Sequence, residues 1–151
     1  MDFGRTKIYA VLFVVVGIII IAFLTTMHYP SQIILKGKVY TVDVADTTYT
    51  MNKGYSGHPP ISHNEGMIFV FPENGKHGFW MKDMLFSLDI IWMDENFVIN
   101  HIEKDVKPDS YPKIFYPEKE ARYVLEISAG EVNKLGVKNG DKVEFIEKYR
   151  I

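Results

Sequence analysis

Apolar and polar residues alternate in several short stretches of the chain, and this two-residue period is typical of half-buried β-strands. In "KVYTVDVADT", Tyr40, Val42 and Val44 share one face, while the more polar Thr41 and Asp43 lie on the other. Further strands are expected in "GMIFVFP", "FVINHIEKDV" and "RYVLEIS". The pattern therefore predicts a sheet of short strands with one buried face.

Glycine and proline divide these strands with turns and loops. We expect irregular loops in "MNKGYSGHPPISHNEG" and "KPDSYPKIFYPEKEA", a strand end at Pro72, and hairpin turns at "DEN" and at Asn139-Gly140. The segment "AGEVNKLG" fits one or two helical turns that end at Gly136. The predicted fold class is mostly β (α+β): a single compact barrel-like or sandwich domain of short strands with one short helix.

An uncharged run, "IYAVLFVVVGIIIIAFL", occupies residues 8–24. Its length as a helix, at about 1.5 Å per residue, approaches the thickness of a bilayer core. A cleaved signal peptide is the main alternative, but the run is longer than the usual apolar region of ~7–15 residues. We expect residues 1–7 to be an N-terminal cytoplasmic flank, 8–24 a transmembrane anchor, 25–37 a tether, and 38–151 the β-rich domain.

The charges around this run predict its orientation. Arg5 and Lys7 precede it, whereas Lys36 and Lys38 follow only after an uncharged flank. Positive residues next to a span favour the cytoplasmic side. We therefore expect a single-pass protein of the cytoplasmic membrane whose soluble domain is extracytoplasmic.

Composition narrows the possible functions. The chain has 151 residues, a formal net charge of -2 and no cysteine. Nothing in this charge indicates a nucleic-acid partner. The absence of cysteine excludes disulfides, thiolate metal sites and a cysteine nucleophile.

The apolar stretch "GFWMKDMLFSLDIIWMD" contains a carboxylate, Asp89, that needs an explanation. The run from Leu88 to Met93 is otherwise apolar on both faces, which predicts a central, buried strand. A buried acid is most often a structural acceptor, bonded here to backbone N–H groups, Lys82 or Arg122. The functional alternative is a desolvated acid with a raised pKa that acts in catalysis.

The residues just before this strand form a second candidate site. In an extended chain Trp80 and Lys82 share one face, and Phe79, Met81 and Asp83 share the other. Lys82 beside an indole ring could hold an anionic ligand. The alternative is a lysine whose stem lies on apolar surface while its ammonium group stays in water.

Histidine and methionine residues raise the question of a metal site. The possible ligands are His58, His63, Glu65 and His77, with Met51, Met67, Met81 and Met84 as soft ligands for copper(I). The "HNE" segment is too short to be a zinc signature, and most of these methionines lie at positions that fill a core. We expect no metal site and no cofactor.

Five segments together resemble a known family. "VDVADT", "GMIFVFP", "GFWMKDMLFSLDIIWMD", "ARYVLEISAG" and "GVKNGDKV", between Val42 and Val143, resemble in content and order the blocks of the uncharacterised family called domain of unknown function 192 (DUF 192). The resemblance implies a small β-rich domain, often behind a signal or anchor segment, with no assigned activity. Two segments depart from the family pattern: "NKGYSG" keeps mainly Gly54, and Asp83 and Met84 follow "FWMK".

From these observations we expect a non-catalytic binding or accessory module. Its contact surface would be formed by "NKGYSGHPPISHNE", "KHGFWMKD" and "YPKIFYP", whose aromatic residues suit a carbohydrate or a partner protein. The residues expected to contact the ligand are Tyr55, His63, His77, Trp80, Lys82, Asp83, Tyr111, Phe115 and Tyr116. The alternative is a hydrolase that uses Asp89 or Asp83 with Lys82 or His77.

Overall fold

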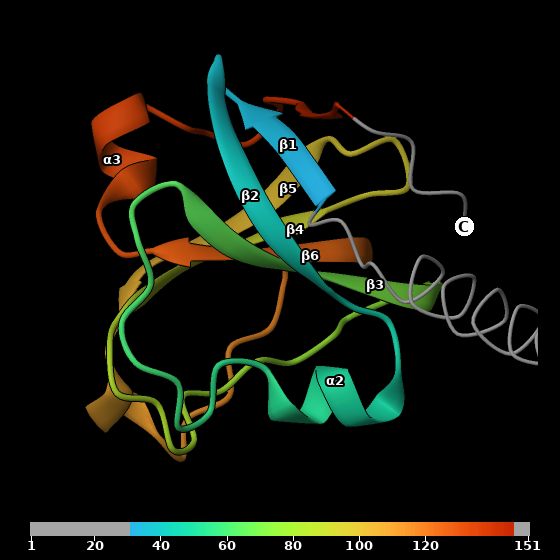
Figure 1. Ribbon diagram of the computed structural model, residues 1–151. Helices are drawn as coiled ribbons and strands as arrows, with labels where there is room; N and C mark the ends of the chain where they lie inside the picture. Colours follow the sequence, from blue (N-terminus) through green and yellow to red (C-terminus); the bar gives the residue numbers. More distant parts are fainter. Residues whose placement is uncertain (1–30, 147–151) are drawn as a thin grey trace, which may run out of the picture.

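The computed structural model describes residues 31–146, which form a single curved sheet with short helices (Figure 1). The strands are β1 (Ser31–Leu35), β2 (Lys38–Ala45), β3 (Glu65–Gly75), β4 (Leu88–Met93), β5 (Ile99–Val106), β6 (Ala121–Ser128) and β7 (Val143–Phe145). The helices are α2 (Thr48–Lys53), the 3-10 helix η1 (Pro108–Ser110) and α3 (Glu131–Leu135). The fold is thus mostly β with a few short helices, as the sequence predicts.

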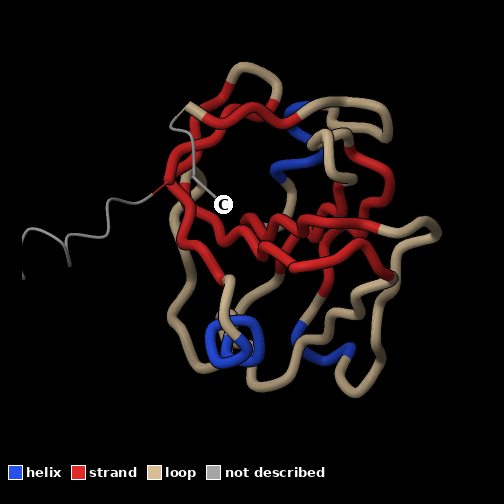
Figure 2. The backbone as a smooth tube through the Cα atoms, turned by 90° about the vertical axis from the view of Figure 1, so that its right-hand side faces the viewer, coloured by secondary structure: helices blue, strands red, loops and turns tan. Residues whose placement is uncertain are grey.

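The seven strands follow the order β5-β4-β6-β3-β2-β1-β7. Neighbouring strands are antiparallel, except for β2 and β3, which are parallel. A parallel pair needs a crossover connection, and here it runs through α2 and the loop after it. Two views at right angles show the sheet curving strongly, with α2 and α3 at its opposite ends (Figures 1 and 2). The crossover therefore covers one open side of the curved sheet.

Strands β4 and β6 are buried on both faces and separate two hydrophobic clusters. All six residues of β4 are buried, which confirms the predicted central strand. In β6, Leu125 and Ile127 pack in the first cluster with residues of β1, β2 and α3. Val124 faces the second cluster, which contains Phe79 and Trp92. The second cluster lies beneath the connections that carry most of the candidate residues.

The expected tether, residues 25–37, is wrong at its C-terminal end. The β domain begins with β1 at Ser31, not at Lys38. Ile33 and Leu35 are fully buried, and β1 pairs with both β2 and β7. Its alternation covers only five residues, "SQIIL". A pattern of five residues is too short to predict a strand within the expected tether.

A second helix, α2, lies in the region expected to be part of an irregular loop. The Thr47 hydroxyl accepts the backbone N–H of Thr50, and the Thr50 hydroxyl accepts that of Thr47. This reciprocal capping satisfies donors at the helix start. The helix ends at Gly54, whose φ of 44° lies in the left-handed region. The prediction missed α2 because threonine, tyrosine and asparagine are weak helix formers and the helix has only six residues.

Two strand boundaries also differ from the prediction. β3 continues past Pro72 to Gly75, with an irregular register between Val70 and Gly75 that accommodates the proline. The expected hairpin around Asn139-Gly140 is wrong, because only β7 follows the turn and β7 pairs with β1. The short helix in "AGEVNKLG" is confirmed as α3, and Gly136 ends it with a φ of 64°.

Within residues 31–146, none of the helices has both the length and the apolar composition required to cross a membrane. The expected transmembrane anchor, 8–24, lies outside the described residues. It stays a prediction from sequence.

Asp89 links three elements through backbone hydrogen bonds. Only 1% of this residue is exposed. One carboxylate oxygen accepts the N–H of Asp105 in β5 at 2.9 Å, and the other accepts the N–H of Val132 in α3 at 2.8 Å. Asp89 thus joins β4 to β5 and caps the first turn of α3, with backbone donors in place of the side chains of Lys82 or Arg122.

We expect Asp89→Asn to lower the free energy of unfolding by about 2–4 kcal/mol, because it removes a buried charge-assisted acceptor and points an amide at a backbone donor. Chemical denaturation of the full chain measures this loss. Asp83→Asn is the matched control: Asp83 is exposed with a φ of 56°, which asparagine tolerates, so its effect should stay within about 0.5 kcal/mol. Equal stability of the two variants would contradict the structural role of Asp89.

Candidate functional site

A cleft of about 130 Å³ lies over the second hydrophobic cluster, between α2 and the segment after β3. Its lining residues are Met51, Asn52, Lys53, Gly54, Ser56, Phe69, Phe71, Gly78, Phe79, Trp80 and Glu126. We call it the Glu126 cleft. Its floor comes from β3 and β6, and its walls come from two connections that are distant in sequence.

Glu126 is the unusual residue of this cleft. It lies in β6 opposite Met67 of β3 and Ile90 of β4, and only 5% of it is exposed. Within residues 31–146 we find no hydrogen bond or ion pair to its carboxyl group. Burial alone raises the pKa of Glu126 to about 8, so the group is mostly protonated at neutral pH.

Aromatic rings line the same cleft as Glu126. Phe79 lies edge-to-face against Phe69, with ring centroids 4.8 Å apart, and against the buried Trp92 at 5.6 Å. Phe71 packs edge-on to Phe79 at 6.4 Å. Trp80 remains 44% exposed at the rim. The cleft therefore has a rigid apolar wall with one indole ring open to a ligand.

Hydrogen bonds hold the two walls together. The Ser56 hydroxyl donates to the carbonyl of Lys82 at 2.9 Å, and the Gly57 N–H donates to the carbonyl of Asp83 at 2.8 Å. The Lys53 ammonium donates to the carbonyl of Ser56 at 2.6 Å. These bonds fix the width of the cleft and occupy Lys53 at its rim.

The third predicted contact loop, "YPKIFYP", packs on the outside of the same wall. Phe79 and Phe115 form a β-bridge with hydrogen bonds in both directions. A Cβ atom on Gly78 would lie 2.6 Å from the ring of Tyr116 and 2.8 Å from the side chain of Ile114. Glycine at position 78 thus allows this loop to approach the cleft wall closely.

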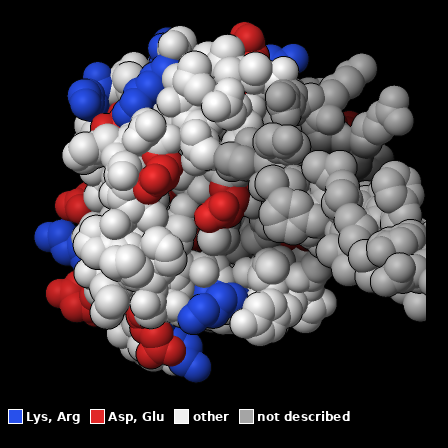
Figure 3. Space-filling model, viewed as in Figure 1, with Lys and Arg blue, Asp and Glu red and all other residues white. Residues whose placement is uncertain are grey.

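A second cleft, of about 200 Å³, adjoins Tyr55. It is lined by Thr41, Asp43, Tyr55, His58, Ile61, Glu65 and Gly66. Burial raises the pKa of Tyr55, and the charges of Glu126, Asp43 and Glu65 add to this effect. Figure 3 shows a hollow on this side of the molecule with acidic side chains at its rim. The surroundings of Tyr55 are therefore strongly acidic.

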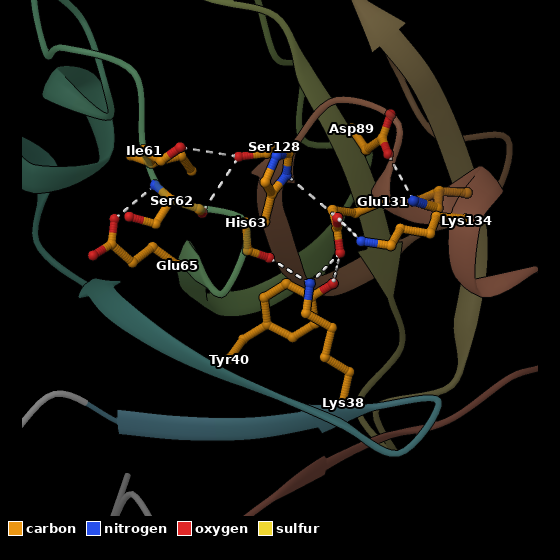
Figure 4. A network of polar contacts seen from close by, with 11 residues as sticks. Lys38, Tyr40, Ile61, Ser62, His63, Glu65, Asp89, Ser128, Glu131 and Lys134 are labelled. Atoms are coloured by element: carbon orange, nitrogen blue, oxygen red, sulfur yellow. Dashed lines mark hydrogen bonds and ion pairs between the residues drawn. The ribbon is translucent and has the colours of Figure 1, made fainter.

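A separate polar network surrounds Glu131 at the start of α3 (Figure 4). Its buried carboxylate pairs with Lys38 and Lys134, accepts the Tyr40 hydroxyl at 2.8 Å, and lies 3.4 Å from Nδ1 of His63. Burial opposes its ionisation, but the hydrogen bonds from Lys38 and Tyr40 and the charges of the two lysines lower the pKa of Glu131 overall. This network therefore stabilises an ionised acid, in contrast to the surroundings of Glu126.

The structure separates the residues of the hydrolase alternative. Asp89 is bonded to backbone groups, His77 stacks on Phe71 with ring centroids 3.6 Å apart, and Lys82 and Asp83 are exposed. No hydrogen bond or ion pair joins these four candidates within the described part of the chain. In the same residues no group of three or more potential ligands among His, Cys, Asp and Glu could hold a metal ion.

The residues predicted to contact the ligand lie at several places in the structure. Trp80 lines the Glu126 cleft, and Tyr55 lines the second cleft. Tyr111 and Tyr116 are about half exposed, as expected. Phe115, also expected to contact the ligand, is buried because it packs in the second hydrophobic cluster.

Sequence reasoning missed Glu126, although a signal existed. The strand "ARYVLEIS" has apolar residues on both of its faces and a single carboxylate, and the structure buries seven of its eight positions. The same pattern directed attention to Asp89 in β4. In β6 the shorter apolar run made Glu126 look like the polar face of a half-buried strand.

We expect the free energy of unfolding to decrease as the pH rises from about 5 to about 8, because of Glu126. Its pKa rises from 4.5 to about 8 on folding, so the folded state binds the extra proton in this window. The contribution is fully present below the unfolded pKa and is lost as the pH rises through the folded pKa. Its slope approaches about 1.4 kcal/mol per pH unit.

Denaturation of the full chain at several pH values, compared with Glu126→Gln, measures this slope. The difference in unfolding free energy between the two proteins should change across this window. Glu131 does not interfere, because its lowered pKa makes its own contribution disappear only at more acidic pH. A constant difference would mean that Glu126 titrates normally.

Comparison with known proteins agrees with the sequence resemblance. The model of the DUF192 family, described as "Uncharacterized ACR", matches residues 32–145. A UPF0127 protein of Thermococcus gammatolerans is 33% identical over 115 residues, covering 73% of this chain and 71% of the relative. One from Thermococcus sibiricus is 27% identical over 114 residues, covering 73% and 70%.

A solved structure shares the fold as well. The crystal structure of a protein of unknown function from Novosphingobium aromaticivorans superposes with a TM-score of 0.70 and 29% identity, covering 76% of this chain and 83% of that chain. Together the family match, the relatives and the shared fold show that this chain belongs to the DUF192 (UPF0127) family.

Proposed function

We propose that the protein is a non-catalytic binding module whose ligand site is the Glu126 cleft. The observation that carries this proposal is a carboxyl group, 5% exposed, that lines an aromatic cleft and has no polar partner among residues 31–146. Burial alone opposes its ionisation, because no charged or polar partner among residues 31–146 offsets the desolvation of the carboxylate. A ligand that bonds to Glu126 would offset this cost.

The surrounding loops support the same interpretation. The connections that contain Lys53–Ser56 and Gly78–Trp80 form the walls of the cleft, and Tyr116 packs against Gly78. These connections belong to the three segments that the sequence selected as a contact surface. Convergence of aromatic loops on one concave, partly apolar site is typical of small-ligand binding.

An enzyme is the less supported alternative. The candidates Asp89, Asp83, Lys82 and His77 have no mutual hydrogen bonds within the described part of the chain, and Asp89 serves as a backbone acceptor. General acid–base chemistry requires groups within hydrogen-bond reach of the same substrate. The Glu126 cleft offers one titratable carboxyl group and a wall of aromatic rings.

We also propose that residues 8–24 anchor this module in the cytoplasmic membrane, with the β domain on the outer side. The support is the uncharged apolar run and the basic residues Arg5 and Lys7 before it. A ligand would then reach the cleft from outside the cell.

For the binding site, we expect small ligands to contact the full chain through the cleft. Saturation-transfer NMR with a panel of monosaccharides, amines and neutral aromatic compounds should detect at least one binder. Glu126→Gln or Trp80→Ala should weaken that binder at least about tenfold, because each removes a group that lines the cleft.

The matched control is Leu85→Ala, since Leu85 is 65% exposed and does not line the cleft. It should bind as the wild type does. Circular dichroism establishes that each variant is folded. A binder that is insensitive to both cleft substitutions would show that the ligand site is elsewhere, and the absence of any binder would contradict the proposal.

For the anchor, we expect the full chain to stay in the membrane fraction after extraction with alkaline carbonate. A variant without residues 1–24 should be released, because it lacks the apolar run. Protease added to intact spheroplasts should degrade the β domain if it faces outward. Release of the full chain by carbonate would exclude a spanning anchor, and protection from protease would exclude the outward orientation.

A further inference from the structure

We infer that the group bound in the Glu126 cleft is an organic ammonium ion, paired with the Glu126 carboxylate and enclosed by the rings of Phe69, Phe79 and Trp80. This inference rests on the proposed function, because it assigns a ligand class to the same cleft. It follows from the carboxyl group, the rings and the charges around them, considered in turn.

The first support is that Glu126 has no cationic partner among residues 31–146. The other buried carboxyl groups have partners: Asp89 has two backbone donors, and Glu131 has two lysines and a tyrosine. Glu126 has none of these within residues 31–146, and it is one of the residues that line an open cleft. A buried carboxylate is stable only when it is paired and hydrogen-bonded, and an ammonium group supplies both the charge and, where it carries N–H, the donor.

The second support is the aromatic wall. The faces of aromatic rings carry negative potential and attract cations, with indole the strongest. Trp80 is the half-exposed ring at the rim, while Phe69 and Phe79 are held at right angles to each other with centroids 4.8 Å apart. Rings in several orientations around one acid suit a rounded cation with methyl or methylene groups.

The third support is the charge of the surroundings, taken from each element next to Glu126. The connection after α2 contributes Tyr55, and Asp43 of β2 and Glu65 of β3 line the second cleft beside it, where the charges of Glu126, Asp43 and Glu65 raise the pKa of Tyr55. Ile90 of β4 is apolar. The Lys53 ammonium is bonded to a carbonyl at the rim. The two carboxylates in the lining of the second cleft favour a cation over an anion on this side of the domain.

The segment before β4 completes the surroundings with two exposed groups of opposite charge, Lys82 and Asp83. Size also limits the ligand. A space of about 130 Å³ is well below the ~300–1,000 Å³ of most small-molecule pockets. It suits a compact head group, such as a methylated ammonium, rather than a whole sugar chain.

Proton balance gives the inference a distinctive signature. The free protein holds the proton on the Glu126 carboxyl group at neutral pH, and the cation binds the ionised form, so binding releases that proton to solvent. Apparent affinity is reduced by the fraction of protein that is in the competent, ionised form. Affinity should therefore rise roughly tenfold per pH unit below about pH 8 and level off above it.

The test compares choline with its uncharged isostere, 3,3-dimethyl-1-butanol, in calorimetric titrations of the full chain in a nonionic detergent. Choline should bind at least about tenfold more tightly. Titrations in buffers of different ionisation enthalpy at pH 7 should show release of close to one proton per choline bound. Repeating them at pH 6 and pH 9 measures the predicted rise in affinity.

Variants separate the roles of the residues. Glu126→Gln should lose the preference for choline and the pH dependence, whereas Trp80→Ala should weaken choline but retain proton release. Glu144→Gln removes an exposed carboxylate in β7, distant from the cleft, and should behave as the wild type. A structural defect alone would not remove proton release while leaving binding of the neutral isostere.

Equal binding of the two probes would overturn the ammonium inference and leave the binding cleft intact. Failure of choline to bind, when other compounds bind through Glu126 and Trp80, would also overturn it and point to another ligand class. Failure of every compound in the panel would instead remove the proposed function itself.

Discussion

Strand β6 must be buried on both faces, and the rest of the structure depends on this constraint. It lies between β3 and β4 and separates the two hydrophobic clusters. Seven of the eight residues of β6 are therefore buried. A carboxyl group in this strand reaches solvent only where the packing is interrupted, and the Glu126 cleft is such an interruption.

Three buried acids illustrate how partners decide chemistry at similar depth. Asp89, Glu126 and Glu131 are all at most 5% exposed. Asp89 is a structural acceptor for backbone N–H groups, and Glu131 is held ionised by lysines and a tyrosine. Glu126 has only apolar neighbours in the strands beside it, so burial alone determines its proton affinity. Burial disfavours the ionised form of each acid, and the partners that are present determine whether the acid is ionised or protonated.

Sequence alone predicted the mostly β fold, the two-sided burial of β4 and the helix α3, because each has a clear period or a strong stop signal. It missed β1 and α2, whose patterns are five and six residues long. It selected loops that border the Glu126 cleft, but it did not select Glu126 itself. The closeness of Glu126 to Gly54 and Trp80 depends on the parallel pairing of β2 and β3 and on the crossover, which no local pattern encodes.

The cleft is built from segments that meet only in the native fold. Lys53–Ser56, Gly78–Trp80 and Glu126 are separated by long stretches of chain, so the unfolded protein has no partial version of the site. Any compound that occupies the cleft must therefore favour the native state by mass action, with a gain of RT ln(1 + [L]/Kd). For this domain, the free energy of unfolding therefore increases with the occupancy of the cleft, so that one can be measured through the other.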